Sequence, residues 1–342
     1  MGPERRLIGE QIRPTPDSVC IVPHLSLVEG SIGDQVIMAT VAANLKDAGL
    51  KRVAVARKNN TYQRQVAQLV RSDLVNFIPV PQGIFDDKLL IFTRMVEYLS
   101  SLPTQAHFLS YERIALIGAK EMRYFMKPPH KSRVDVFPDD LKNQPSHQRI
   151  ADYCYQRLRG VYNLAARPNL KPVRLTIPQR FQDVIEKWAK RENLELDKPF
   201  WLINLSTGNP SKNWPVNNFF NIARWLQQNF HTPVVMFNPS VSDKDQVANF
   251  LSHQPQTYFF TSSHIAESSY LIKKASGYIG GDTGMTHIAA ALGTSFVTVF
   301  PNCNLPAWQP ITANQPHQIL SAESVSEIIP EQVMAAIISL HS

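Results

Sequence analysis

Short apolar runs alternate with longer amphipathic segments along much of the 342-residue chain. A short apolar run bounded by polar residues has the character of a buried strand, and apolar residues spaced by three and four positions form one face of a helix. Such alternation is typical of a parallel sheet whose strands are joined by crossover helices. The pattern therefore predicts an α/β protein.

The first half carries one clear strand-helix-strand unit. The apolar runs expected to be strands are Cys20 to Pro23, Arg52 to Ala56, Val75 to Val80, Ala106 to Leu109 and Ile114 to Gly118. Between the first two, a helix is expected from Gln35 to Ala48, with its apolar residues on one face and Gly49 placed to end it. A second helix is expected from about Gln148 to Leu164.

The second half repeats the alternation more clearly. Six strands are expected, at Phe200 to Leu205, Pro233 to Phe237, Thr257 to Phe260, Gly277 to Gly280, Phe296 to Phe300 and Gln318 to Leu320. Helices fill most of the gaps. The clearest has Phe219, Ile222, Ala223 and Leu226 at helical spacing, so it is expected to bury a single stripe.

Length and composition favour two domains. A chain of 342 residues is too long to fold around one ordinary hydrophobic core, and at 44% hydrophobic it has enough apolar residues to build two. Pro168, Pro172 and Pro178 punctuate the middle, where we expect the linker. The predicted domains are residues 1–172 and 173–342, and paired α/β sheets of this kind bind ligands in a cleft at the carboxyl ends of their strands.

Charge is distributed unevenly between the halves. Met1 to Arg174 contains 25 Lys and Arg against 16 Asp and Glu, whereas the remainder contains 10 against 12. The first half is therefore expected to meet an anionic partner: a nucleic acid, an acidic membrane surface or a phosphorylated glycan. No recognised nucleic-acid-binding motif accompanies the charge, so we expect no nucleic-acid partner.

Other compositional features exclude whole classes of protein. No run of eighteen apolar residues occurs, and the segment from Met1 to Arg13 is polar, so we expect neither a membrane span nor a signal peptide and place the protein in the cytoplasm. Cys20, Cys154 and Cys303 form no CxxC pair, which argues against a disulfide framework or a zinc cluster.

The most specific motif runs from Gly280 to His287 with the sequence GGDTGMTH. Thr283 and Gly284 present backbone amides at a helix N-terminus, where a pyrophosphate is favoured, and glycines permit close backbone approach. Asp282 is expected to meet a ribose hydroxyl or a loop amide, and His287 to donate to a phosphate oxygen. The alternative is an ordinary strand-to-helix turn with Asp282 as its N-cap.

A second motif runs from Ser206 to Pro215 with the sequence STGNPSKNWP, and again leaves a strand and enters a helix. Its hydroxyls and Lys212 suit phosphate oxygens, and a cation there would stabilise a departing diphosphate. The alternative is a solvated lysine, with Trp214 and Pro215 packing the start of the helix.

A third motif, GSIGD from Gly30 to Asp34, opens the first helix. A carboxylate facing the cleft could take the proton from an attacking hydroxyl, whereas a simple turn and cap is the alternative. The Asp243-Lys244-Asp245 triplet is of DxD type, but it lies at an expected helix start where acidic residues meet the dipole, so we interpret it as structural.

In this order, the three motifs resemble glycosyltransferase family 9, the ADP-heptose:lipopolysaccharide heptosyltransferases. The matching elements are Ser31-Ile-Gly-Asp34, Pro210-Ser-Lys-Asn-Trp-Pro215 and Asp282-Thr-Gly-Met-Thr-His287, with a closing helix at Glu327 to Val333. The resemblance implies the GT-B fold, two Rossmann-like domains facing across a central cleft. It also implies inverting transfer of a sugar from an ADP-sugar co-substrate, with no tightly bound cofactor and no catalytic metal.

Carried over residue by residue, the resemblance assigns roles. Asp34 would be the general base and Lys212 the diphosphate anchor. The donor would be held by Thr207, Gly208, Lys212, Asp282, Thr283, Gly284 and His287. The acceptor, an anionic lipid-linked glycan at the inner face of the inner membrane, would be met by Ser31, Gly33, Arg123, Lys127, Lys131 and Arg133, with a solvated basic loop as the alternative for the last four.

Two departures from the family pattern keep other functions open. About four additional residues within His24 to Glu29 precede the Ser-Ile-Gly-Asp loop, and Asn238-Pro239-Ser240 stands where the family has a glycine-rich turn followed by acidic residues. The alternatives are a transferase with another sugar donor, an epimerase acting on a nucleotide sugar, and a non-catalytic glycan-binding or assembly partner that binds ADP-sugar without consuming it.

Overall fold

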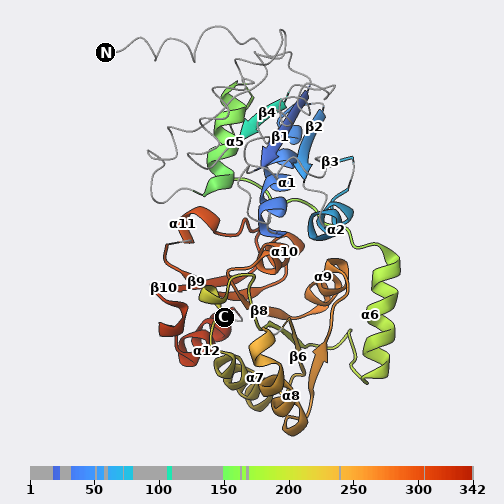
Figure 1. Cartoon of the computed structure of the whole chain (residues 1–342), viewed down its shortest axis with the longest axis vertical. Helices are drawn as coiled ribbons and strands as arrows, with labels where there is room; N and C mark the ends of the chain where they lie inside the picture. Colours follow the sequence, from blue (N-terminus) through green and yellow to red (C-terminus); the bar gives the residue numbers. More distant parts are fainter. Residues whose placement is uncertain are drawn as a thin grey trace. The chain divides into compact units, whose positions relative to one another are not determined.

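A computed structural model of the chain divides it into two compact units (Figure 1). The first comprises Met1–Arg64 and Arg71–Leu170, and the second comprises Gln65–Val70 and Lys171–Ser342. The structure describes residues 18–23, 32–50, 52–57, 61–71, 73–79, 106–109, 149–161, 164–166, 169–238, 240–303 and 305–340.

The described part of the first unit contains a four-stranded parallel sheet in the order β3-β2-β1-β4. Its strands are β1 (Ser18–Pro23), β2 (Arg52–Arg57), β3 (Asn76–Pro79) and β4 (Ala106–Leu109). These confirm four of the apolar runs expected to be strands. The fifth, Ile114 to Gly118, and the basic segment from Lys120 to Asn143 lie outside the described residues.

Helix α1 (Ile32–Asp47) follows β1 and is buried on almost every side. It packs against α5 (Ile150–Val161) and against β2. The buried Thr40 and Asn44 satisfy their polar groups within the helix, each donating to the carbonyl one turn earlier at 2.9 and 2.8 Å. Gly49, at φ 120°, ends the helix as expected, since only glycine adopts this conformation without strain.

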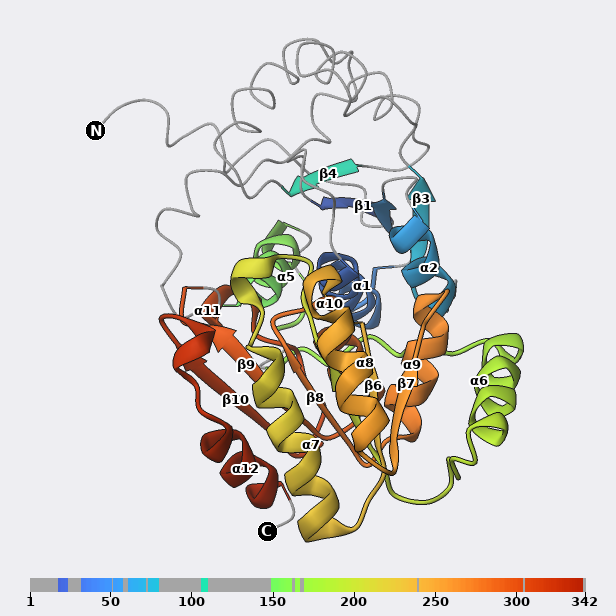
Figure 2. The same cartoon turned by 60° about the horizontal axis from the view of Figure 1, so that its bottom comes forward.

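The second unit is built on a six-stranded parallel sheet in the order β10-β9-β8-β5-β6-β7. Its strands are β5 (Trp201–Asn204), β6 (Val234–Phe237), β7 (Thr257–Phe260), β8 (Gly277–Gly281), β9 (Phe296–Pro301) and β10 (His317–Ala322). Figure 2 shows the sheet from β10 on the left to β7 on the right. The chain runs outward from β5 through β6 and β7, returns to β8 beside β5, and then runs outward the other way. The direction therefore reverses between β5 and β8.

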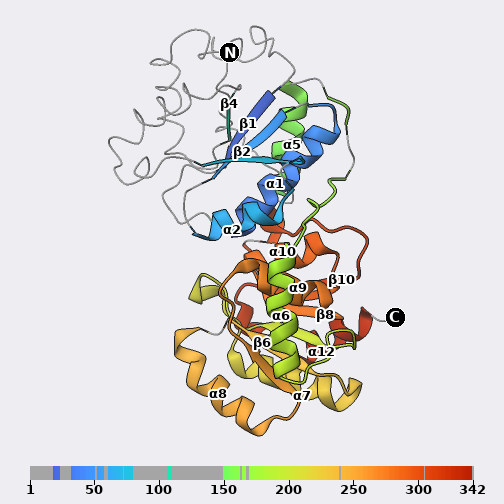
Figure 3. The same ribbon diagram turned by 90° about the vertical axis from the view of Figure 1, so that its right-hand side faces the viewer.

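Helices cover both faces of this sheet. They are α6 (Gln179–Arg191), α7 (Val216–Phe230), α8 (Lys244–His253), α9 (Ile265–Lys274), α10 (Gly284–Leu292), α11 (Leu305–Trp308) and α12 (Pro330–Ser339). Helix α12 packs on α7, while α10 and α6 both pack on α9 (Figure 3). The predicted stripe of α7 is confirmed, because Phe219, Ile222, Ala223 and Leu226 are all buried.

The core of the second unit includes the buried residues of the central strands and of α7 and α12. Every residue of β5, β6, β8 and β9 is buried, which explains why these strands read as continuous apolar runs. Aromatic rings pack within the same core: Trp214 contacts Phe219 edge-on at 4.9 Å, and Phe220 stacks on Phe250 at 4.2 Å.

A short segment from early in the sequence completes the second unit. The end of helix α2 (Thr61–Leu69) belongs to it, and Val70 forms an antiparallel bridge with Leu175. Gln65 Oε1 accepts a hydrogen bond from the backbone amide of Ile265 at 2.9 Å, at the first residue of α9. The second unit is therefore discontinuous in sequence.

No helix in the described part of the chain combines the length and the apolar character that crossing a bilayer requires.

Candidate functional site

Two loops meet at the carboxyl edge of the second sheet, where the strand order reverses. One leaves β5 after Asn204, and the other leaves β8 after Gly281. The two strands pair in parallel, with Ile203 opposite Ile279, so both loops emerge at the same edge. Open α/β sheets bind ligands at such a reversal point. The structure thus brings together the two second-half motifs.

Lys212 and Asp282 form an ion pair between these loops. Lys212 Nζ lies 2.8 Å from Asp282 Oδ2, and the side chains are 29% and 8% exposed, respectively. The carboxylate is therefore buried below the ammonium, which still faces solvent in part. This pairing was absent from the sequence interpretation, which expected a ribose hydroxyl or a loop amide beside Asp282.

The hydroxyl groups of the β5–α7 loop donate to the protein. Thr207 Oγ1 donates to the carbonyl of Asn209 at 2.7 Å, and Ser211 Oγ donates to Asn209 Oδ1 at 3.0 Å. Ser206 Oγ donates to the carbonyl of Asn238 at 2.7 Å. These bonds make the loop a pre-formed turn in the conformation observed, and the expected contact of its hydroxyls with phosphate oxygens stays a prediction.

The glycines at the end of β8 make room for protein groups. A Cβ at Gly280 would lie 2.4 Å from the Tyr278 hydroxyl, and one at Gly281 would lie 3.0 Å from Thr207 Cγ2. The sequence interpretation expected these glycines to permit close backbone approach. Such an approach is present at Gly281, where the end of β8 meets the loop that follows β5.

Helix α10 begins directly after this contact. Thr283 is its N-cap, in extended conformation, and Gly284 is its first residue. The helix N-terminus therefore lies beside Asp282, as expected, and its dipole favours a negative charge there. Asp282 precedes the cap, so the alternative of an Asp282 N-cap is wrong. His287 is only 6% exposed, and its proposed contact with a phosphate stays a prediction.

The loop after β6 carries the Asp243-Lys244-Asp245 triplet at a helix start, as the structural interpretation predicted. Asp243 accepts from Ser240 Oγ at 2.5 Å and is the N-cap residue of α8, while Asp245 lies in its first turn. Within the described ranges, no group of three or more His, Cys, Asp or Glu is placed to hold a metal ion.

In the first unit, Gly33 and Asp34 lie in the first turn of α1. The helix begins three residues earlier than predicted, so Asp34 is inside it, where the dipole favours a carboxylate. Asp34 is partly exposed. The remaining predicted acceptor residues, Ser31, Arg123, Lys127, Lys131 and Arg133, lie outside the described residues.

The sequence profile of glycosyltransferase family 9 (heptosyltransferase) matches residues 165–333, which include both loops of the site. The part of the chain that matches glycosyltransferase family 9 is thus just under half of its 342 residues. Lipopolysaccharide heptosyltransferase 3 of Escherichia coli (strain K12) is 30% identical over 106 residues, which cover 30% of this chain and 31% of that relative. The matched segment thus spans about a third of the relative's length.

Solved structures show the same fold over nearly the whole chain. A family 9 glycosyl transferase from Veillonella parvula covers 95% of this chain and 97% of its own, with a TM-score of 0.70 and 14% identity. The E. coli ADP-heptose lps heptosyltransferase II covers 95% and 98%, with a TM-score of 0.64 and 15% identity. E. coli heptosyltransferase WaaC with ADP covers 94% and 99%, with a TM-score of 0.61 and 12% identity. These similarities confirm the predicted GT-B fold.

Sequence reasoning missed three polar residues that lie next to the two loops of the site. Asn204 and Tyr278 are buried within apolar strands, and Asn238 ends β6 at φ 55°, a conformation that Asn tolerates better than most residues. Burial raises the pKa of Tyr278 to about 12, so its hydroxyl stays protonated. The sequence feature that could have revealed these buried polar residues is the single asparagine in the otherwise apolar run from Phe200 to Leu205.

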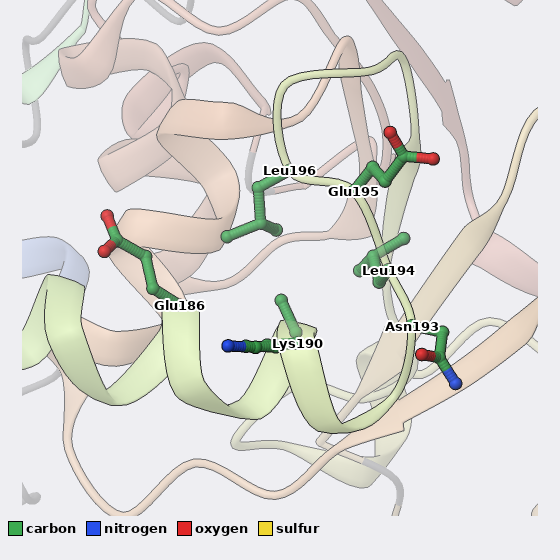
Figure 4. A pocket seen from close by; sticks show the side chains of 7 residues that line it. Glu186, Lys190, Asn193, Leu194, Glu195 and Leu196 are labelled. Atoms are coloured by element: carbon green, nitrogen blue, oxygen red, sulfur yellow. The ribbon is translucent and has the colours of Figure 1, made fainter.

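A surface hollow of about 470 Å³ lies at the end of α6 (Figure 4). It is lined by Glu186, Ala189, Lys190, Asn193, Leu194, Glu195 and Leu196. All of these belong to one continuous segment, in which Asn193 at φ 57° turns the chain after the helix. The hollow is a product of this turn and contains no predicted site residue.

Proposed function

We propose that the chain is an inverting glycosyltransferase that moves a heptose from ADP-heptose to an inner-core acceptor of lipopolysaccharide or lipooligosaccharide. The observation that supports this most strongly is the Lys212–Asp282 pair at the strand-order reversal, beside the N-terminus of α10. It places a cation and a helix dipole together in the half of the chain that matches family 9.

The departing diphosphate needs this positive potential. As the glycosidic bond breaks, negative charge accumulates on the leaving group, and donors already fixed in place stabilise it without reorganisation. Lys212 is the diphosphate anchor in this proposal, and the first turn of α10, with Thr283 and Gly284, adds backbone donors. The charge is thus supplied by the protein, with no tightly bound cofactor or metal assigned to the step.

The adenine nucleotide is proposed from solved relatives. One structure of WaaC is described with ADP and another with ADP-2-deoxy-2-fluoro heptose. The dodecameric heptosyltransferase TibC is described in complex with ADP-D-beta-D-heptose, with a TM-score of 0.51. In this chain Thr207, Gly208, Asp282 and His287 complete the proposed donor site around Lys212.

Asp34 is the proposed general base. Its carboxylate takes the proton of the acceptor hydroxyl as the hydroxyl oxygen attacks the anomeric carbon from the face opposite the diphosphate. The new carbon–oxygen bond forms as the bond to the diphosphate breaks, so the configuration inverts and ADP leaves. The position of Asp34 in the first turn of α1, partly exposed, supports this role.

The acceptor is proposed to be an anionic lipid-linked glycan, met by the basic first half of the chain. Ser31, Gly33, Arg123, Lys127, Lys131 and Arg133 are the proposed contacts. Such an acceptor is anchored in a membrane, so the proposed location is the cytoplasm, with transient contact at the inner face of the inner membrane. No nucleic acid is part of the proposal.

Calorimetric titration with ADP, UDP and GDP, in buffer without divalent metal, tests the donor assignment. We expect selective binding of ADP, and its loss in Lys212→Met. The matched control is Lys274→Met, which removes a lysine of the same unit that pairs with Asp197 at 2.9 Å. Preference for UDP or GDP would show that the donor is a different nucleotide sugar, and no binding of any of the three nucleotides would overturn the proposal.

Incubation with ADP-heptose alone, and then with an isolated core acceptor, separates the alternatives. The proposed transferase releases ADP only when the acceptor is present. Conversion of the sugar without acceptor would identify an epimerase, and tight binding without consumption under either condition would identify a non-catalytic partner.

A further inference from the structure

Four polar residues form a line beneath the carboxyl ends of β6, β5 and β8. We call Asn238, Asn204, Tyr278 and Thr286 the buried network. Asn204, Tyr278 and Thr286 are almost completely inaccessible to solvent, although their neighbours in the strands are apolar. A buried polar group destabilises the fold unless it is hydrogen-bonded. Each of these groups has such a partner.

The hydrogen bonds of the buried network run in one direction. Asn238 Nδ2 donates to Asn204 Oδ1 at 3.1 Å, and Asn204 Nδ2 donates to the Tyr278 hydroxyl at 3.2 Å. The Tyr278 hydroxyl lies 3.4 Å from Thr286 Oγ1, which itself donates to the carbonyl of Gly281 at 2.7 Å. Because the Tyr278 hydroxyl accepts from Asn204, and Thr286 uses its own hydrogen on the Gly281 carbonyl, the Tyr278 hydrogen is directed at Thr286. Bonds aligned in this way polarise and strengthen one another.

The two ends of the buried network hold the two loops of the site. At one end, Asn238 Nδ2 also donates to the carbonyl of Ser206 at 3.3 Å, and the Asn238 carbonyl accepts from Ser206 Oγ. Ser206 directly precedes Thr207. At the other end, the Gly281 carbonyl belongs to the peptide that leads into Asp282. The network therefore fixes the orientation of both peptides from which the site is built.

We propose that the buried network positions the Lys212–Asp282 pair for a diphosphate, so that Asn204, Tyr278 and Thr286 are positioning residues for the donor. This inference rests on the proposed function. Stability alone does not require polar groups here, because replacing both partners of a buried hydrogen bond by apolar groups of the same shape can be nearly neutral. Positioning does require them, because a displacement of about 1 Å at a binding group can reduce activity by about 100-fold.

Thr286→Val tests the proposal with little change of shape. The hydroxyl is lost, but the Gly281 carbonyl still accepts from Thr298 Oγ1 at 3.1 Å, so the fold keeps a bond at this point. Thr286→Ser retains the hydroxyl and is the rescue variant. Tyr270→Phe is the matched control, since Tyr270 is also buried in the second unit and its hydroxyl donates at 2.9 Å to Glu186, which belongs to none of the motifs.

The readout is the calorimetric dissociation constant of ADP compared with that of AMP, which lacks the second phosphate. In Thr286→Val we expect the Kd of ADP to rise about tenfold, because one charge-assisted contact to the second phosphate is misplaced. The Kd of AMP, which lacks that phosphate, should change by less than about twofold. Thr286→Ser and Tyr270→Phe should bind both nucleotides as the wild type does. General structural damage, by contrast, would weaken both nucleotides to a similar degree.

Two results would overturn the positioning role while leaving the proposed function intact: unchanged ADP binding in Thr286→Val, or equal weakening of ADP and AMP. A wild-type protein that binds neither nucleotide would instead overturn the proposed function, and the positioning role would fail with it.

Discussion

Removing the cation of the Lys212–Asp282 pair should destabilise the second unit measurably. Lys212→Met keeps most of the length and the apolar stem of lysine but removes the charge. Asp282, which is only 8% exposed, then loses its ion-pair partner while remaining buried. Removing a cation that lies 2.8 Å from a buried carboxylate takes away favourable charge pairing, so the folded state rises in free energy.

The expected magnitude follows from the burial of the two side chains. Removing one partner from a fully buried pair costs about 3–5 kcal/mol, whereas exposed pairs contribute about 0–1 kcal/mol. The Lys212–Asp282 pair lies between these limits, because Lys212 is 29% exposed. We expect a loss of about 2 kcal/mol in the free energy of unfolding, which corresponds to a fall in Tm of about 4–8 °C for a unit of this size.

Tryptophan fluorescence measures this loss in the relevant unit. All five tryptophans of the chain lie between Trp188 and Trp308, so the signal follows the second unit alone. Lys274→Met is the control, because its partner Asp197 is 92% exposed and the expected shift in Tm is within about 1–2 °C. Equal shifts for the two variants would refute the reasoning from burial.

Three further predictions concern the base, a pH effect and a glycine. Asp34→Ala should lower kcat about 100-fold or more while leaving ADP affinity nearly unchanged, as measured by steady-state kinetics and calorimetry, and full activity would remove Asp34 from the proposed role. Burial lowers the pKa of His264 below 6.5, and its Nδ1 accepts from the amide of Ala266 at 3.0 Å, so the folded state favours the neutral ring. This contribution to stability should be complete above pH 6.5 and should be lost as the pH falls through the lowered pKa of His264. Fluorescence melts over this pH range measure the loss. In His264→Asn, whose side chain can still cap the helix, the melts should not show this loss. Gly280→Ala would place a Cβ 2.4 Å from the buried Tyr278 hydroxyl and should lower stability by about 1–3 kcal/mol, whereas Gly208→Ala, with nothing within 4 Å, should leave the melting curve unchanged.

The sequence predicted the second sheet well because its four inner strands, β5, β6, β8 and β9, are buried on both faces. Such strands read as short apolar runs, and all six were found close to their observed limits. The stripe of α7 was equally clear, since one face of the helix is buried and the other is exposed. Helix α1 was located, but its burial on almost every side could not be read from a pattern that assumes one apolar face.

The motifs of the site were predicted, but the contacts between them were not. Lys212 and Asp282 are 70 residues apart, and their pairing follows from the parallel register of β5 and β8, which a single sequence does not specify. The inward orientation of Asn238 depends on a left-handed backbone at the end of β6. Local patterns therefore identified the residues, whereas the sheet determined their partners.

The segment Gln65–Val70 makes the biosynthesis of the second unit depend on an early part of the polypeptide. The amide of Ile265, at the start of α9, is satisfied by a side chain made 200 residues earlier, and Leu69 accepts from the backbone amide of Thr176 at 2.7 Å. A fragment that starts at Lys171 would lack both contacts. On the ribosome, residues 65–70 emerge first and have no partner until the second unit follows, so the two halves of the chain are not independent modules that can be exchanged at a single junction.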